Sequence, residues 1–252
     1  MKRKVKTKVK GFRTTDGAGV KLVRVLGNLT TKEFDPILML DSFDSINPDD
    51  YTAGFPMHPH RGIETISYVS RGKMVHRDSL GNEAGISDGE VQWMNSGSGI
   101  MHEEMVPAAE RLLGVQLWLN LPAKDKMSKP SYNSIKNEDI KEIEIEGGKI
   151  RLLAGKYGEH EGYKGDYLSM DYYDIHLNAD AEVTLTMEED DSVMVFTLLG
   201  DVYIDGEHIE EKTAVKLTEG DSLTIKNGNE KAQVLYMNSR ALNERLHGPV
   251  RL

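Results

Sequence analysis

The sequence predicts an all-β protein made of two similar β-barrels in tandem. Short strand-like stretches alternate with turn residues at close intervals, which is typical of β-sandwiches and barrels. The same succession resumes after residue 146, and Gly72 and Gly200 each follow a long apolar stretch. This spacing indicates an internal repeat of about 140 to 160 residues. A chain of 252 residues is long enough for two modest domains, each with a core.

The first half contains the predicted strands of one barrel. Before residue 50 we expect strands over 5–9, 21–25 and 37–40, and the first of these alternates valine with lysine. That alternation favours an edge strand with one solvated face, whose lysines discourage pairing with other chains. Five further segments have strand character: IETISYV (63–69), KMVHRDS (73–79), EVQWM (90–94), IMHEEMV (100–106) and GVQLWLNL (114–121).

The second half repeats the pattern after a polar, proline-bearing stretch over 121–145, which we interpret as a linker. The segments with strand character are KIRLLAG (149–155), DYLSMDYYDIHL (166–177), AEVTLTM (181–187), SVMVFTLLGDVYID (192–205), TAVKL (213–217), DSLTIKN (221–227) and AQVLYMN (232–238). We therefore expect a first barrel over residues 1–135 and a second barrel over residues 136–252.

Composition excludes several classes of function. The net charge of −10 argues against a nucleic-acid surface, which is normally basic. No apolar run approaches the roughly 18 residues of a membrane span, and no signal-peptide core follows the basic start, so we expect a cytoplasmic protein. The chain has no cysteine, so any metal site must use His, Asp and Glu. These are the ligands of non-haem iron, manganese, nickel, cobalt, copper or catalytic zinc.

Two clusters of residues predict such a metal site in the first barrel. His58 and His60 lie two apart in an extended stretch, so both imidazoles project to one face, and Pro59 stiffens the pair. His102 and Glu104 form a second same-face pair after a glycine-rich turn. Three imidazoles and one carboxylate suit a divalent metal and leave positions open for a substrate or dioxygen. The second half contains neither cluster, so we expect it to bind no metal.

The two clusters resemble the two-motif pattern of the cupin superfamily, H-x-H-x3-E followed by G-x-x-H. More specifically, four strings resemble the pirin family: HPHRGIETISY, HRDSLGN, GEVQWMNSGSGIMHEEM and GVQLWLNLP. This resemblance runs nearly unbroken from about residue 38 to 122 and implies a bicupin, two tandem cupin-type barrels. ALNERLHGP (241–249) is similar to the closing segment of the family, after which relatives commonly continue into a helical tail.

The pirin resemblance implies that His58, His60, His102 and Glu104 are the metal ligands and that Glu104 is the catalytic residue. The plain cupin pattern instead nominates Glu64, which shares the face of His60 by strand parity. We expect Glu104, because the HEEM string follows the pirin pattern, and Glu64 then supports a ligand imidazole or forms a separate pair. The expected cofactor is one divalent transition metal, Fe²⁺ first, with Ni²⁺, Co²⁺, Mn²⁺, Cu²⁺ or Zn²⁺ as alternatives.

The other histidines and the tryptophans have plainer interpretations. We interpret His76 as a structural or rim residue rather than a fifth ligand, and His176 and His208 as surface residues. Trp93 and Trp118 lie in strand patterns and are expected in the core, with an aromatic wall for a substrate as the alternative.

The resemblance implies a metal-dependent quercetin 2,3-dioxygenase that cleaves flavonols with O₂ and releases CO. Its partners are then a small aromatic substrate and O₂, with no direct contact to nucleic acid or membrane, and we expect a monomer. The alternative is a non-catalytic regulator that senses metal or redox state and binds a protein partner, as the resemblance to pirins also allows. Another cupin activity with the same ligands, such as sugar isomerisation, stays open because fold and ligands do not fix the substrate.

Overall fold

The structure is a computed structural model that describes residues 1–244, where the chain forms 24 β-strands and two short 3-10 helices. Most of the predicted closing segment over 241–249 falls outside these described residues. The chain divides into two compact units. No helix in the described part of the chain has the length and apolar character needed to cross a membrane.

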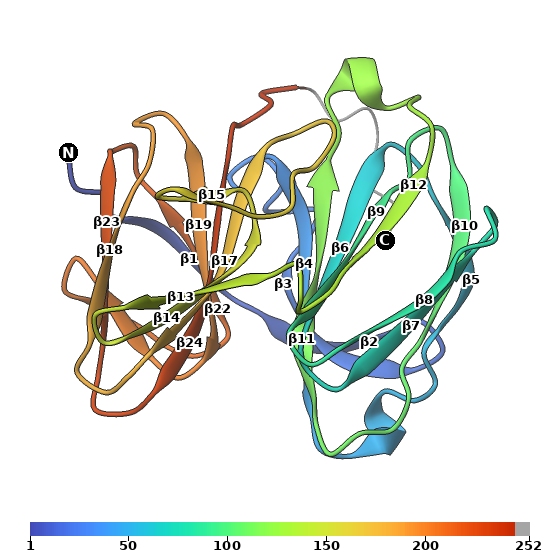
Figure 1. The fold of residues 1–252 in the computed structure, drawn as a ribbon, viewed down its shortest axis with the longest axis horizontal. Coiled ribbons are helices and arrows are strands. Elements are labelled where there is room, and N and C mark those ends of the chain that lie inside the picture. Colours follow the sequence, from blue (N-terminus) through green and yellow to red (C-terminus); the bar gives the residue numbers. More distant parts are fainter. Residues whose placement is uncertain (245–252) are drawn as a thin grey trace. The chain divides into compact units, whose positions relative to one another are not determined.

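Of the described residues, the first barrel comprises Phe12–Thr31, Ile37–Asn137 and Glu244. Its larger sheet has the strand order β12-β9-β6-β11-β4-β3-β2, and its smaller sheet has the order β5-β10-β7-β8 (Figure 1). The strands are β2 (Phe12–Asp16), β3 (Val20–Leu26), β4 (Ile37–Ser45), β5 (Phe55–His60), β6 (Ile63–Arg71), β7 (Lys73–Asp78), β8 (Glu83–Ser87), β9 (Glu90–Asn95), β10 (Ile100–Met105), β11 (Leu112–Asn120) and β12 (Ser131–Ile135). The two short helices, Pro48–Asp50 and Ala123–Asp125, lie in connections of this barrel.

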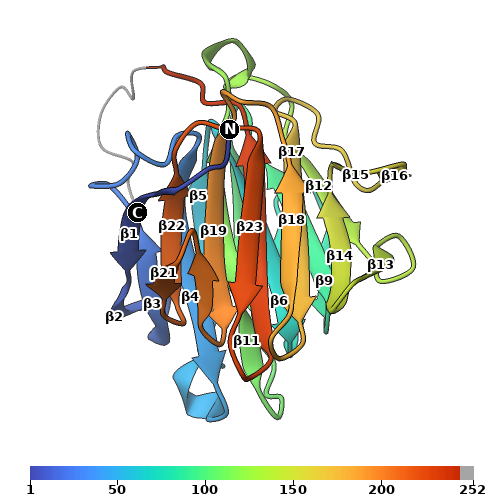
Figure 2. The same cartoon turned by 90° about the vertical axis from the view of Figure 1, so that its left-hand side faces the viewer.

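The second barrel comprises Met1–Gly11, Lys32–Pro36 and Glu138–Asn243. Its larger sheet has the order β1-β22-β19-β24-β17-β14-β13, and Figure 2 shows β18, β23 and β21 of its smaller sheet, β18-β23-β20-β21. The strands are β1 (Val5–Lys10), β13 (Lys141–Ile145), β14 (Gly148–Ala154), β15 (Lys156–Tyr157), β16 (His160–Glu161), β17 (Met170–Leu177), β18 (Glu182–Thr186), β19 (Ser192–Leu199), β20 (Val202–Ile204), β21 (Glu207–Ile209), β22 (Thr213–Leu217), β23 (Ser222–Asn227) and β24 (Ala232–Ser239).

The predicted internal repeat is present strand for strand. The central strands β9, β6, β11 and β4 of one larger sheet take the places of β22, β19, β24 and β17 in the other. Gly72 and Gly200 occupy matching turns, with φ of 105° and 72°. A Cβ atom at Gly72 would lie 2.9 Å from the Arg111 carbonyl oxygen, and one at Gly200 would lie 2.8 Å from that of Lys231. Both turns therefore need glycine for the same two reasons, backbone conformation and close approach.

Several segments differ from the predicted organisation. Residues 1–11 and 32–36, predicted in the first barrel, lie in the second, where β1 pairs with β22 from Val5 opposite Leu217 onward. The predicted edge character of this strand is correct, because β1 ends its sheet and its side chains alternate between half-buried and exposed. The linker predicted over 121–145 instead contains β12 and β13, which form edges of the two larger sheets.

Candidate metal centre

Two neighbouring strands of the first barrel carry the three predicted ligand histidines. β5 pairs with β10 in antiparallel fashion, and this register places His102 directly opposite His58. His60 shares the face of His58 because alternate residues of a strand project to the same side. Pro56 and Pro59 restrict the backbone of β5 around these histidines. A short, stiff strand and its partner thus bring three imidazoles together.

The nitrogen atoms of these imidazoles converge on one point. The Nε2 atom of His58 lies 3.0 Å from Nε2 of His60 and 3.0 Å from Nε2 of His102. One candidate ligand atom from each histidine lies within 4.8 Å of the others, and this is the one group of at least three His, Asp or Glu side chains with such geometry in residues 1–244. Nitrogens 3.0 Å apart can both lie about 2.1 Å from a single ion, the usual metal–nitrogen distance.

One hydrogen bond and two lowered pKa values favour a cation between the three rings. Nδ1 of His58 lies 2.8 Å from the carbonyl oxygen of Pro56, which can only accept, so Nδ1 carries a hydrogen, and in the neutral ring Nε2 is then bare. Burial, reinforced by the neighbouring histidines, lowers the pKa of His60 to about 3 and that of His102 to about 2. Neutral imidazoles are the form that binds metals, and adjacent lone pairs repel unless a cation lies between them. The donor set therefore fits a divalent metal ion.

Glu104 is close to this group but does not belong to it. It lies on β10, 1% exposed, and accepts hydrogen bonds from the side-chain amides of Gln92 and Gln116, the latter at 2.7 Å. Ser67 donates a longer bond of 3.4 Å to the same carboxylate. Burial raises the pKa of Glu104, while the bond from Gln116 opposes the rise. Its role as a fourth ligand stays a prediction.

Glu64, the alternative carboxylate, also lies outside the three-histidine group. It is 1% exposed on β6 of the larger sheet, opposite Asn95 and Leu119 in the adjacent strands. The structure thus brings together the three histidines that both sequence patterns share, and the choice between the two carboxylates stays a prediction.

His76 has a closer relation to the site than its sequence interpretation as a structural or rim residue. It is fully buried on β7, and its Nδ1 lies 3.3 Å from Nδ1 of His102. Its Nε2 lies 2.9 Å from a carboxylate oxygen of Asp78. The signal in the sequence was the spacing His76-x-Asp78, which places both side chains on one strand face.

The tryptophans occupy the core, as predicted, but one of them also borders the site. Trp93 is 1% exposed on β9. Trp118 on β11 is 6% exposed and meets His60 edge to face, with ring centroids 5.0 Å apart. Trp118 thus forms part of the apolar wall next to His60, a position that is compatible with the alternative interpretation of an aromatic wall for a substrate.

The second barrel has apolar residues at the corresponding strands. β18 and β23 place Val183 opposite Ile225 and Leu185 opposite Leu223, and all four side chains are buried. This interior packs as a hydrocarbon core without imidazoles.

The other two histidines singled out in the sequence lie in the second barrel and pair with carboxylates. His176 contacts Asp174 at 2.8 Å and is part-exposed, and His208 contacts Asp201 at 2.8 Å near the surface.

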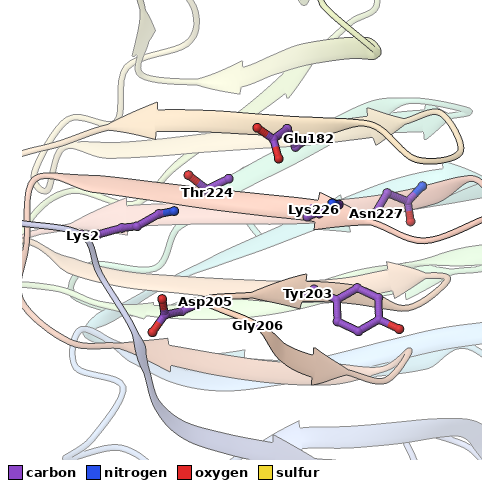
Figure 3. Close-up of a pocket in the computed structure, with 8 residues that line it drawn as sticks. All are labelled: Lys2, Glu182, Tyr203, Asp205, Gly206, Thr224, Lys226 and Asn227. Carbon is purple, nitrogen blue, oxygen red and sulfur yellow. The ribbon is translucent and has the colours of Figure 1, made fainter.

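A shallow pocket also lies on the outer face of the smaller sheet of the second barrel (Figure 3). It has a volume of about 470 Å³. Its lining mixes both charges, with Lys2, Lys226, Glu182 and Asp205 around Tyr203. Glu182, Tyr203 and Lys226 come from β18, β20 and β23, whereas Lys2 and Asp205 lie outside the strands. These side chains do not converge on a point, unlike the three histidines of the first barrel.

Comparison with known proteins identifies the family. Residues 19–119 match the Pirin domain, and residues 172–249 match the Pirin C-terminal cupin domain. A Pseudomonas aeruginosa protein, named as a candidate quercetin 2,3-dioxygenase, is 38% identical over 251 residues, covering 95% of this chain and 88% of its own length. The chain belongs to the pirin family.

Solved pirin-type structures confirm the bicupin fold. A quercetin 2,3-dioxygenase from Acinetobacter baumannii is 29% identical with a TM-score of 0.89, covering 98% of this pirin and 90% of that chain. A bacterial pirin from Escherichia coli, solved in complex with nickel(II), has a TM-score of 0.72 at 19% identity, covering 93% of this chain and 98% of its own. Both the expected family and the expected two-barrel architecture are therefore correct.

Proposed function

We propose that this pirin is a metal-dependent dioxygenase of the quercetin 2,3-dioxygenase type, with its site in the first barrel. The observation that carries the proposal is the convergence of three imidazoles, His58, His60 and His102, in a chain related to proteins with that name. The three Nε2 atoms would hold one divalent ion, for which Fe²⁺ is our first choice and Ni²⁺ an alternative supported by the Escherichia coli pirin. The second barrel supports the fold without metal chemistry.

When bound, the metal would act as a Lewis acid that makes the 3-hydroxyl group of a flavonol more acidic. Glu104 is the proposed acceptor of that hydroxyl proton. Its raised pKa makes its carboxylate a better base than an exposed glutamate. Gln92 and Gln116 each donate a hydrogen bond to it, so the carboxylate is held in one direction before the substrate arrives.

The remaining contributions of the chain are orientation and exclusion of water. Trp118 packs its ring edge against His60 and limits the rotation of that imidazole. The buried interior around His102 and Glu104 keeps water away from an electron-rich substrate, which limits side reactions with dioxygen. The overall reaction consumes one flavonol and one O₂, cleaves the 2,3-bond and releases CO.

The test is a quercetin assay with protein loaded separately with Fe²⁺, Ni²⁺, Co²⁺, Mn²⁺, Cu²⁺ and Zn²⁺. We expect flavonol consumption together with stoichiometric CO release for at least one ion. The matched control is His58→Ala, which removes one ligand while leaving the second barrel untouched. Absence of product with every ion, in protein shown to bind them, would overturn the proposed function.

A further inference from the structure

A buried chain of polar contacts lies behind the ligand His102. β7 and β10 pair so that Asp78 is opposite His102 and His76 is opposite Glu104. Nδ1 of His102 is 3.3 Å from Nδ1 of His76, and Nε2 of His76 is 2.9 Å from Oδ2 of Asp78. Both histidines are fully buried, so water does not compete for these contacts.

The surroundings of Asp78 fix the first hydrogen in this chain. Its Oδ1 accepts from the backbone N–H groups of Leu80 at 2.8 Å and Asn82 at 3.1 Å, and its Oδ2 accepts from the Asn82 side-chain amide at 2.8 Å. A carboxyl group that accepts three hydrogen bonds is held as the carboxylate, which has no hydrogen to donate. The hydrogen between Asp78 and His76 therefore belongs to Nε2 of His76.

The remaining hydrogens follow from this one. A neutral His76 with its hydrogen on Nε2 has a bare Nδ1, which can only accept. The hydrogen between the two imidazoles must then lie on Nδ1 of His102, and Nε2 of His102 is bare. That bare atom is the one 3.0 Å from Nε2 of His58. The ring of Tyr132 stacks on His76 with centroids 4.0 Å apart at 12°, which holds its plane.

We propose that Asp78 and His76 form a positioning relay that sets the tautomer and ring orientation of His102 for metal binding. The inference rests on the proposed metal site of the first barrel. Without the relay, His102 can place its hydrogen on Nε2 and lose the lone pair that a metal needs. His58 also carries a hydrogen on Nδ1, which it donates to the Pro56 carbonyl oxygen. Removing an outer partner of a metal-bound histidine typically costs about 10- to 100-fold in metal affinity.

The first test measures the tautomers directly. In protein labelled with ¹⁵N-histidine, long-range ¹H–¹⁵N spectra distinguish nitrogens that carry hydrogen from those that do not. For metal-free wild-type protein we expect hydrogen on Nδ1 of His102 and on Nε2 of His76. Addition of zinc(II), which is diamagnetic, should leave both assignments in place and shift the Nε2 signals of His58, His60 and His102. Hydrogen on Nε2 of His102, or on Nδ1 of His76, overturns the relay.

The second test measures zinc(II) affinity by competition with a chelator in three variants. His76→Phe keeps the ring that stacks on Tyr132 but removes both nitrogens, and we expect a loss of about 10- to 100-fold. His76→Asn keeps an acceptor near the position of Nδ1, and its affinity should lie closer to wild type than to H76F. The matched control is His176→Phe, because His176 contacts Asp174 at 2.8 Å in the second barrel, with no metal ligand behind it. H176F should bind zinc as wild type does.

The outcomes separate the relay from the proposed function. Unchanged affinity in H76F shows that the nitrogens of His76 are not needed, and equal losses in H76F and H76N show that an acceptor at the position of Nδ1 does not restore binding. Either result overturns the relay, while flavonol cleavage by wild type would still stand. Wild-type protein with the expected tautomers and tight zinc binding, but without flavonol cleavage, retains the relay and removes the dioxygenase. If H76F does not fold, the tautomers measured in the wild-type protein test the relay on their own.

Discussion

Glu104 is held by side-chain amides in a way that suits proton transfer more than ligation. Gln92 and Gln116 donate to its carboxylate, and burial raises its pKa. We predict that Glu104→Gln lowers the rate of flavonol cleavage by about 100- to 10,000-fold, the usual contribution of a general base. Metal content, measured by elemental analysis after dialysis, should stay at the wild-type level.

The same variant distinguishes the two roles assigned to Glu104. If E104Q loses its metal together with its activity, Glu104 is a ligand, as the resemblance to pirins implies. Glu64→Gln provides the matched control, because Glu64 is as deeply buried, on β6 of the larger sheet, and also lies outside the three-histidine group.

Lys216 carries an electrostatic cost in the second barrel. Burial, together with the charge of Lys6, lowers its pKa from 10.5 to about 8. Between these pH values the unfolded chain binds more protons than the folded one, so the free energy of unfolding rises with pH. The buried charge of Lys216 therefore lowers the free energy of unfolding by its full amount below pH 8, and this destabilisation disappears above about pH 10.5. A pKa shift of this size corresponds to about 3 kcal/mol.

We therefore predict that Lys216→Met raises the free energy of unfolding at pH 7 by about 1 to 3 kcal/mol and that this advantage shrinks at pH 10. Urea unfolding followed by circular dichroism at both pH values measures the difference. The exposed Lys226 on the same barrel provides the control, since Lys226→Met leaves burial unchanged. An advantage of K216M that is equal at both pH values would contradict the assigned cause.

At the residue scale, strand parity explains how much of the site the sequence could predict. Alternation placed His58 with His60 and predicted the face of His102, because a period of two needs only local information. The contact of His76 with His102 depends on the register between β7 and β10, which no local pattern contains. The hydrogen bonds of the Glu104 carboxylate likewise depend on partners contributed by β9 and β11.

Among the elements, the turn that leads into β10 controls where His102 lies. Gly97 has a φ of +41°, and a Cβ atom there would lie 2.1 Å from the Ser128 carbonyl oxygen. We predict that Gly97→Ala lowers the free energy of unfolding of the first barrel by about 3 kcal/mol, the sum of a left-handed backbone penalty and a backbone clash. Urea unfolding followed by tryptophan fluorescence reports on this barrel, because both tryptophans of the chain lie in it.

Gly81 supplies the comparison for this turn. Its φ is +90°, but no heavy atom lies within 4 Å of the position that a Cβ atom would take, so Gly81→Ala should cost only the backbone penalty of about 1 to 2 kcal/mol. Equal losses in G97A and G81A would show that the contact with Ser128 relaxes without cost.

Two of the strands that the sequence missed, β12 and β13, share one physical property. Both are edge strands, and most of their side chains are exposed or only half-buried. Edge strands bury little surface, so their sequences, SYNSI and KEIEI, lack the apolar density that identified the central strands. The central strands β6, β9 and β11 were found because nearly every side chain in them is buried.

For the whole molecule, metal binding should distinguish the two barrels. All three proposed ligands lie in the first barrel, and binding to the folded state adds about 2.7 kcal/mol at a metal concentration of 100 Kd. We predict that zinc(II) slows amide hydrogen exchange in peptides that cover β5, β6 and β10, and much less in those that cover β18 and β23. Equal protection in both barrels, or none in the first, would contradict a single site.

The two-barrel organisation was predictable because the repeat is present in the order of strands and turns. The membership of residues 1–11 was not, because VKTKVK fits an edge strand of either barrel equally well. Only its pairing with β22, which lies more than 200 residues later, decides between them.

That pairing also has a consequence for biosynthesis. The backbone N–H of Lys4 meets the side chain of Thr218, 214 residues further along the chain. At about 5 to 20 residues per second, the ribosome needs roughly 10 to 40 seconds to deliver that partner. By the end of this interval the ribosome has synthesised all the strands of the two sheets of the first barrel, whereas the backbone of β1 is still unpaired. We infer that the alternating lysines of β1 disfavour pairing of this strand with other chains until β22 has been synthesised.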